Sequence, residues 1–346
     1  MEDLLSMTLP ELTEAVTDMG EKKFRARQIY EWIHKKGAAS FSEMTNVPKN
    51  LREKLAGAYS FSAPEIRTVQ ESKIDGTRKY LFRMSDGEYV ESVLMRYQYG
   101  LSVCISSQVG CRMGCSFCAS TLLGLTRNLT AGEMLSQVYA IQRDMGERIS
   151  HVVVMGTGEP MDNYDNLVRF LHMISDENGL HISERDLTVS TCGIVPGIRK
   201  LAEEKMAINL ALSLHAPNDE LRKKIMPVAR AYSLKEIFEA LDLYYEATKR
   251  RLTFEYSLIR GVNDSDECAR ELSRLLGRRN ALVNLIPVNP VRETGYRETA
   301  RTDVLAFQKK LENYGIHVTI RREMGRDIDG ACGQLRKRYE ETDSHL

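Results

Sequence analysis

The chain lacks any apolar run close to the roughly 20 residues that a transmembrane helix needs. It also begins without a secretory signal, because Met1-Glu2-Asp3 is acidic where a signal would be basic and then apolar. The 48 basic and 48 acidic side chains leave a formal net charge of zero, so only a local basic face would indicate a nucleic-acid partner. We therefore expect a cytoplasmic protein with reduced thiols and no membrane partner.

With 346 residues, the chain is too long for one small core, and it suits a barrel-sized domain joined to a smaller one. Its 42% apolar and 28% charged residues are typical of a globular protein. Changes of pattern along the chain predict a helical segment at 1–60, a β-strand extension at 61–100 and a core at 101–346.

The first 60 residues show helical patterns. Thr8 is placed to cap a helix with Pro10 in its first turn, a second helix is expected over 22–36, and a third follows. Trp32 lies in a part of this segment where four acids oppose nine bases, a net charge of +5: Lys22, Lys23, Arg25, Arg27, Lys35, Lys36, Lys49, Arg52 and Lys54. This pattern predicts either a solvated helix surface or an RNA-binding face, and it does not choose between them.

Beyond about residue 64 the apolar residues change to a period of two. Strands are expected at 79–83 and 89–95 around a turn at 85–87. A further strand at 101–106 leads directly into a cysteine-rich stretch.

After the cysteine-rich stretch, short apolar runs alternate with helical patterns. Thr130 and Glu133 form a capping-box signature at the start of a helix that should end near Gly146. Further strands are expected at 151–155, 187–190, 208–214, 252–258 and 282–287, and helices near 164–175, 233–248, 264–276 and 302–314. With the strand at 101–106 these make six β/α units, too few for a closed eight-unit barrel. The predicted fold is α/β: a partial (β/α)6 barrel with a small helical N-terminal domain and a β-hairpin extension.

Three of the seven cysteines, Cys111, Cys115 and Cys118, lie within eight residues, so one curl of backbone can bring their thiols together. Iron–sulfur clusters are held by Cys thiolates, and a cubane usually takes four. Because no fourth Cys is close by, one iron would be left open to a substrate or cofactor. Zinc is the alternative, but zinc sites usually pair two C-x2-C units or add His, and no His lies between His34 and His151. The spacing favours the cluster.

Polar residues follow the predicted barrel strands at the edge that also carries the cysteines. A Gly-rich turn contains Gly158 and Glu159; its glycines would let the backbone approach a ligand, and Glu159 would accept from an ammonium group. Other strand ends carry Ser190, the segment 213–215 and Asn289. Each alone is more typical of a loop hydrogen bond than of a ligand contact, but together they predict a shared pocket.

Two further thiols are candidate functional residues. Cys332 lies among glycine and alanine, close in sequence to several arginines, which predicts an accessible thiol with a lowered pKa. Cys104 is in mid-strand, where burial is usual, yet it is close to the cysteine-rich stretch. Cys192 and Cys268 are expected to be structural. The basic run at 222–224 is expected to be a solvated face or a set of phosphate contacts.

Taken together, these residues resemble a known family. The segment 104–111, the C-x3-C-x2-C run, the turn at 158–160 and the segments 213–219 and 331–335 are similar, in the same order, to motifs of the radical SAM RNA methyltransferase family of RlmN and Cfr. The resemblance covers nearly the whole chain. Several of these motifs are specific to this family rather than to radical SAM enzymes in general.

The resemblance implies one [4Fe–4S] cluster on Cys111, Cys115 and Cys118, with its open iron chelated by S-adenosylmethionine (SAM). It places the SAM contacts at Gly158, Glu159, Ser190, Ser213, Leu214, His215 and Asn289. Two SAM molecules are implied per turnover.

Three other residues are implied to act on the RNA. One SAM methylates Cys332 by displacement, and the second is cleaved to a 5′-deoxyadenosyl radical that takes hydrogen from the S-methyl group. The resulting carbon radical adds to electrophilic C2 of adenine, where a polar methyl transfer cannot occur. Cys104 then attacks Cys332 to form a disulfide and release the product, and Glu91 accepts the C2 proton.

RlmN members of the family methylate C2 of adenosine 2503 in 23S rRNA and of adenosine 37 in some tRNAs. Cfr members methylate C8 of the same rRNA base and confer antibiotic resistance, and they are the alternative. A non-catalytic RNA-binding module with a structural metal is an alternative of another class. The resemblance further implies a cytoplasmic monomer whose partners are 23S rRNA, tRNA and an electron donor such as flavodoxin or ferredoxin.

Overall fold

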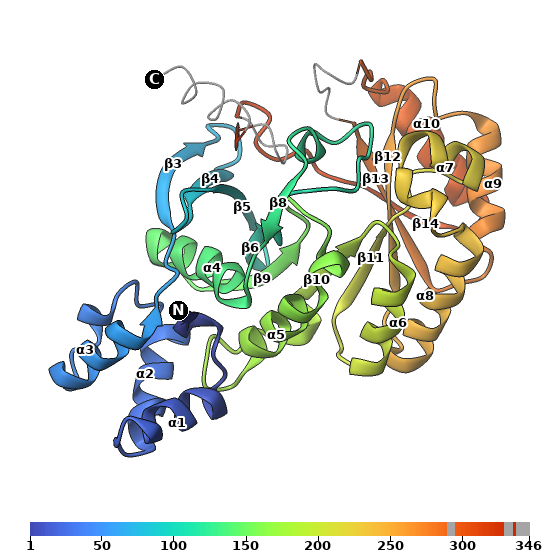
Figure 1. The fold of residues 1–346 in the computed structure, drawn as a ribbon. Helices are drawn as coiled ribbons and strands as arrows, with labels where there is room; N and C mark the ends of the chain where they lie inside the picture. The colour runs from blue at the N-terminus through green and yellow to red at the C-terminus, as the bar shows by residue number, and fades with distance from the viewer. Residues whose placement is uncertain (289–294, 329–334, 337–346) are drawn as a thin grey trace.

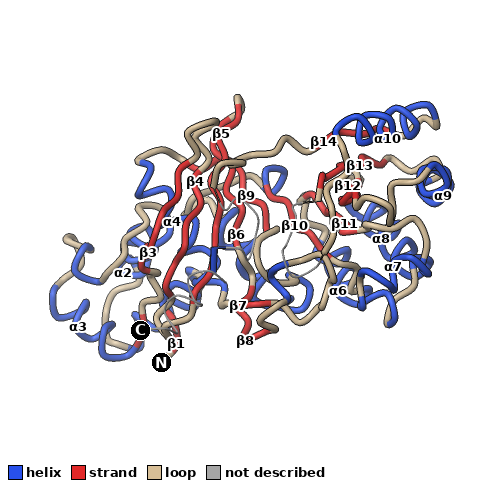
Figure 2. Tube along the Cα trace, turned by 90° about the horizontal axis from the view of Figure 1, so that it is seen from above, coloured by secondary structure: helices blue, strands red, loops and turns tan. Residues whose placement is uncertain are grey.

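The computed structural model describes residues 1–288, 295–328 and 335–336. A ten-stranded mixed sheet runs through these ranges and stays open, with β14 and β3 at its two edges (Figures 1 and 2). Each helix in the same ranges is too short or too polar to span a bilayer. In order across the sheet, the strands are β14 (His317–Ile320), β13 (Ala281–Pro287), β12 (Leu252–Leu258), β11 (Asn209–Ser213), β10 (Leu187–Thr191), β9 (Ile149–Val154), β6 (Gly100–Ile105), β5 (Tyr89–Tyr97), β4 (Arg78–Arg83) and β3 (Glu65–Glu71).

Within this sheet, β6 and β9 to β14 are all parallel, and helices cross between them on the outer side of the sheet (Figure 1). These helices are α4 (Ala131–Met145), α5 (Tyr164–Ser175), α6 (Val195–Glu204), α7 (Asp219–Ile225), α8 (Leu234–Thr248), α9 (Asp266–Leu276) and α10 (Arg301–Asn313). The six predicted strands coincide with β6 and β9 to β13, which confirms the partial (β/α)6 barrel. The sequence does not predict β14, because four residues with half-exposed and exposed side chains give little periodic signal.

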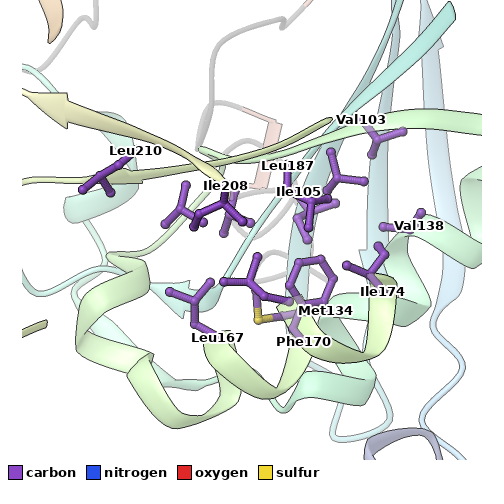
Figure 3. Packing of buried hydrophobic residues seen from close by; sticks show 14 of the residues in the cluster. Val103, Ile105, Met134, Val138, Leu167, Phe170, Ile174, Leu187, Ile208 and Leu210 are labelled. Carbon is purple, nitrogen blue, oxygen red and sulfur yellow. The ribbon is translucent and has the colours of Figure 1, made fainter. Parts of the chain in front are cut away.

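The main core lies between the parallel strands and helices α4 and α5 (Figure 3). Val103 and Ile105 of β6 lie among side chains such as Val138 of α4 and Phe170 of α5, and all four are completely buried. Full burial of each such side chain stabilises the fold by about 1.5–3 kcal/mol. Since successive strand residues point to opposite faces, Cys104 between them faces the inside of the barrel.

Three helices, α1 (Leu9–Asp18), α2 (Phe24–His34) and α3 (Lys49–Ala58), form the N-terminal segment. The predicted cap of α1 is present, because Thr8 and Glu11 form a capping box. Tyr30 is buried and donates to Asp176 Oδ2 at 3.0 Å, so α2 is tied to the end of α5. Trp32 is only partly buried, with a lysine amine 3.7 Å from its ring centre.

The β-extension lies on the other side of β6. The predicted hairpin is present as β4 and β5, and Gly87 in the turn between them has φ +92°. β3 pairs antiparallel with β4 and forms the edge. The sequence does not predict β3, whose side chains alternate between exposed and half-buried.

The chain after β14 runs back across the open side of the sheet toward β3, β4 and β5 (Figure 1). Gly325 N–H donates to Asp75 Oδ2 at 3.0 Å, and Asp327 accepts from Ser72 Oγ at 2.5 Å and from Lys73 N at 2.8 Å. We call residues 321–328 the strap. The strap therefore connects the two edges of the sheet, which do not pair with each other.

Candidate active site

The three clustered cysteines lie on a loop that closes a small two-stranded sheet, made of β7 (Gln108–Gly110) and β8 (Leu125–Asn128). At the base of the loop, Cys111 N–H donates to Gly124 O at 2.8 Å. Gly110 has φ +79°, and a Cβ atom there would lie 1.9 Å from Gly124 O, so only glycine fits. The loop is clamped at its base, and it follows the carboxyl end of β6, where the fold predicts the chemistry.

The thiols of this loop influence one another and lie mostly out of water. Burial raises the pKa of Cys111 to about 12, and the nearby Cys118 adds to the effect. Burial also raises the pKa of Cys115, and Cys118 and Cys111 raise it further. As free thiols these two groups hold their protons at neutral pH, and a metal centre would displace those protons on binding. Three neighbouring thiols fit an iron–sulfur cluster.

In the described ranges, no three Cys, His, Asp or Glu side chains are grouped to hold one metal ion. A cubane needs no such group, because each thiolate binds a different iron.

Other loops hold the cysteine loop from outside. Ser116 N–H donates to Ile225 O at 2.9 Å, and the hydroxyls of Ser116 and Tyr296 are hydrogen-bonded at 2.8 Å. The Phe117 ring packs edge-on against the His215 ring, with 4.9 Å between centroids. The predicted metal ligands and one predicted SAM contact are therefore neighbours.

Glu159 is buried, and its carboxylate is bound by its own chain. It accepts from Thr191 Oγ1 and Cys192 N, both at 2.7 Å, and from Met161 N at 3.1 Å. Burial raises the pKa of Glu159, although the hydrogen bonds oppose this shift. The side chain ties the loop after β9 to the end of β10. A ligand ammonium group would have to share oxygens that already have partners.

Gly158, the neighbour of Glu159, has φ +112°. A Cβ atom there would lie 2.7 Å from the Gln108 side chain and from Ser107 Oγ. Glycine is thus required here by the close approach to the start of β7, and the predicted approach to a ligand stays a prediction.

Other predicted SAM contacts meet at the ends of β10 and β11. The hydroxyl oxygens of Ser190 and Ser213 are 3.3 Å apart. Leu214 is completely buried, and its N–H donates to Glu255 O at 3.0 Å, so its side chain belongs to the core. Asn289 lies outside the described residues.

His215 has a fixed tautomer and no charge. Its Nδ1 accepts from Ser257 N at 2.9 Å, which leaves the ring proton on Nε2. Burial lowers the pKa of His215 to about 3, and the charge of Arg222 acts in the same direction. At neutral pH the ring therefore presents one N–H donor.

Glu91 lies on β5 and is paired in the interior. Its Oε2 is 2.7 Å from Lys79 Nζ, and the two side chains are 2% and 0% exposed. Its Oε1 accepts from Arg336 N at 2.5 Å. The carboxylate therefore joins β4, β5 and Arg336 near the C-terminus.

Cys104 shares the inner face of the sheet with Glu91. β5 and β6 pair so that Cys104 lies opposite Val93, and Glu91 is two residues from Val93 on the same face. Cys104 is 4% exposed and belongs to a small apolar cluster against which Met324 of the strap packs. Cys332 lies outside the described residues.

The environment of Arg222 corrects a prediction. The run 222–224 is expected to be solvated or to contact phosphates, but Arg222 is 0% exposed, while Lys223 and Lys224 are exposed. The prediction is wrong for Arg222 because α7 turns it inward. Arg222 and Ile225 are three residues apart and both buried, so helical spacing is the signal that marks this face.

Lys79 is a second residue that sequence reasoning misses. Tyr80 and Phe82 of the same strand belong to the main core, so Lys79 has to face the inside of the barrel. In the register of β4 and β5, Leu81 lies opposite Glu91, which makes Lys79 the diagonal neighbour of Glu91. This pairing depends on the register of the strands, and the register is not visible in one strand alone.

Comparison with known proteins extends over both parts of the chain. Residues 2–60 match the family model described as the ribosomal RNA large subunit methyltransferase N-terminal domain, and residues 105–272 match that of the radical SAM superfamily.

Two relatives are similar over almost their whole length. The "Probable dual-specificity RNA methyltransferase RlmN" of Lachnospira eligens is 59% identical over 341 residues, which cover 99% of this chain and 97% of the relative. The protein of the same name from Lachnoclostridium phytofermentans is 61% identical over 337 residues, covering 97% and 95%. Among solved structures, the crystal structure of a radical SAM methyltransferase from Sphaerobacter thermophilus matches with a TM-score of 0.93 at 43% identity, covering 96% of this chain and 99% of that chain.

Proposed function

The chain belongs to the RlmN family of radical SAM RNA methyltransferases, and we propose that it methylates C2 of adenosine 2503 in 23S rRNA and of adenosine 37 in some tRNAs. Membership of this family brings one [4Fe–4S] cluster and SAM, used twice per turnover. The observation that carries the proposal is the clamped loop with three cysteines, which follows the carboxyl end of β6. On the inner face of the sheet, Cys104 of β6 lies near Glu91 of β5.

In this proposal, Cys111, Cys115 and Cys118 hold the cluster. SAM lies against Gly158, Glu159, Ser190, Ser213, Leu214, His215 and Asn289. When bound, the cluster and SAM supply the methyl group and the one-electron chemistry that polar side chains cannot supply. The chain contributes position: the neutral His215 ring offers one donor, and two serine hydroxyls lie side by side.

Glu91 is the acceptor of the C2 proton. Its contact with Lys79 holds the carboxylate on the inner face of the sheet, which also carries Cys104.

Cys332 carries the methyl group, and Cys104 attacks Cys332 to form the disulfide that frees the RNA. Two neighbours of Cys332 in sequence support this pairing. Met324, eight residues before it, packs near Cys104, and Arg336, four residues after it, binds Glu91.

The segment 1–60 is an RNA-binding domain in this proposal, 61–100 is an extension and 101–346 is the catalytic core. Support for RNA contact comes from a groove between the end of α2 and α4, lined by Lys35, Lys36, Arg143 and Arg148 among others. The enzyme acts as a cytoplasmic monomer and takes its electrons from flavodoxin or ferredoxin.

Mass mapping of the RNA products tests the proposal. The protein is reconstituted with iron and sulfide without oxygen and is incubated with SAM, a reductant, and unmodified 23S rRNA fragments or tRNA. We expect 2-methyladenosine at both positions. A methyl group at C8 would assign the Cfr reaction instead, and a cluster-loaded protein that methylates neither RNA would contradict the proposal.

A further inference from the structure

Arg222 is a completely buried cation with an incomplete set of hydrogen bonds. Its Nη2 donates to Cys192 O at 2.6 Å and to Ser213 O at 3.2 Å, and its Nε donates to Leu214 O at 3.2 Å. Its Nη1 is also buried, yet it has no hydrogen-bond partner among the described residues.

The partners that Arg222 has are neutral carbonyls. A buried charge is stable only when an opposite charge or an equivalent set of dipoles compensates it. The ionisable groups nearby are Cys192, Cys115, Asp219 and Glu159. Cys115 and Cys192 pack in one cluster with Ile225 of the same helix as Arg222. Asp219 accepts from Leu234 N, and Glu159 is held by the donors described above. Neither of these carboxylates forms an ion pair with Arg222 in the described structure.

We infer that Arg222 is the counter-charge of the iron–sulfur cluster and makes its one-electron reduction easier. This inference rests on the cluster of the proposed function, with Cys115 as a ligand. Three thiolates on a [4Fe–4S]2+ core give a net charge of −1, and one electron from a flavoprotein or ferredoxin makes it −2 without moving a proton. A fixed buried cation stabilises the more negative state more strongly, because charges interact strongly where water is excluded.

The same guanidinium also fixes the ends of β10 and β11 through its carbonyl contacts. Arg222 is therefore a positioning residue as well as a source of charge, and a test has to separate the two roles. Arg222→Gln removes the charge and keeps polar N–H donors. Arg222→Lys keeps the charge and loses the forked hydrogen bonds.

The test is a redox titration of the reconstituted proteins, followed by electron paramagnetic resonance without SAM. For Arg222→Gln we expect the reduction equilibrium to become at least tenfold less favourable, which is about 59 mV for one electron. Arg222→Lys should stay close to wild type. The matched control is Arg250→Gln, since Arg250 has an unpartnered Nε in the described structure but binds Asn209 at the opposite end of β11. It should leave the equilibrium unchanged.

Each outcome decides the question. An unchanged reduction equilibrium of the cluster in Arg222→Gln would overturn the inference. The same result is expected if the free Nη1 serves only to bind the SAM carboxylate. If Arg222→Gln takes up no iron, the iron content of Arg222→Lys decides. Iron uptake by Arg222→Lys supports the counter-charge. If neither variant takes up iron, Arg222 has a structural role and the inference is overturned. A wild-type protein that assembles no cluster would instead contradict the proposed function.

Discussion

Cys104 faces the inside of the barrel, where Met324 of the strap packs near it. With the proposed roles, we expect Cys104→Ala to accumulate a covalent protein–RNA adduct and to release no product, because the thiol proposed to attack Cys332 is gone. Cys332→Ala should form no adduct, since it lacks the proposed methyl carrier. A denaturing gel with labelled RNA measures both.

Cys268→Ala is the matched control for these two variants, because Cys268 is 9% exposed and lies on α9, outside the site. It should turn over like wild type. An RNA adduct in Cys332→Ala would show that another residue carries the methyl group.

Two buried histidines make the stability of the protein depend on pH. His34 is completely buried, with its Nδ1 2.8 Å from the Tyr139 hydroxyl. Burial lowers the pKa of His34 to about 3, only partly opposed by Asp176, and burial has the same effect on His215. An unfolded histidine titrates near 6.5, so between pH 6.5 and 3 the unfolded state binds more protons. Stability is therefore full above pH 6.5 and is lost as the pH falls below it.

For His34 this linkage amounts to about 1 kcal/mol between pH 7 and pH 5.5. We expect His34→Gln, whose amide can still bond Tyr139, to lose about 1 kcal/mol less stability than wild type over that interval. Urea unfolding at the two pH values measures the difference. His317→Gln, which alters an exposed histidine of β14, should behave like wild type, and equal losses in all three proteins would refute the assignment to His34.

At the scale of elements, the hairpin of β7 and β8 determines whether the three thiols stay together. Gly110→Ala would place a methyl group 1.9 Å from Gly124 O at a residue with φ +79°. The loop must then move, so we expect the iron content after reconstitution to fall by more than half, while the unfolding temperature of the apo-protein changes little. Iron and sulfide analysis measures the loss.

Gly124→Ala provides the control from the same hairpin. Gly124 also has positive φ, at +69°, but a Cβ there meets nothing within 4 Å. Gly124→Ala should lose only the stability that a non-glycine residue loses at positive φ, about 1 kcal/mol. The variant should retain its iron. Equal loss of iron in both variants would show that backbone conformation, rather than the close approach at Gly110, controls the loop.

Elements with strong local signals are predictable from the sequence. Thr130 and Glu133 form the capping box expected of them, and α4 ends at Met145 with Gly146 as its cap. α6 has a weaker signal: Pro196 suits its first turn, but no side chain caps its start and Gly197 disfavours helix. Gly197 is present because a Cβ there would lie 2.8 Å from Met161 Cβ, a contact made only in the folded chain.

The candidate site also has residues with a local sequence signal and residues placed only by the folded chain. The thiols of Cys111, Cys115 and Cys118 are predictable because their spacing is local. The pairing of Lys79 with Glu91 depends on the register of β4 and β5. The spacing of Arg222 and Ile225 marks one face of α7, but whether that face is buried depends on where α7 packs. Register and packing arise from contacts between distant parts of the chain, so a linear pattern cannot supply them.

At the scale of the whole molecule, the open barrel leaves β3 and β14 as separate edges, and the strap crosses between them (Figure 2). Its attachment to the β3–β4 side includes Asp327, which accepts from Ser72 and Lys73, and Gly325, which donates to Asp75. Met324 of the same strap packs near Cys104. The strap therefore connects the two edges of the open barrel, and it also contacts the inner face on which the RNA chemistry is proposed.

Asp327→Ala removes the acceptor that holds the strap to Ser72 and Lys73. We expect faster proteolytic cleavage of the C-terminal segment and slower RNA methylation, with iron content unchanged, because the strap is released while the cysteine loop is not. Limited proteolysis, product mapping and iron analysis measure the three effects. Asp242→Ala is the control, since Asp242 of α8 pairs with Arg279, away from the strap. If Asp327→Ala is cleaved and methylates RNA like this control, the strap does not hold the proposed methyl-carrying segment in place, and the contact of Arg336 with Glu91 must do so alone.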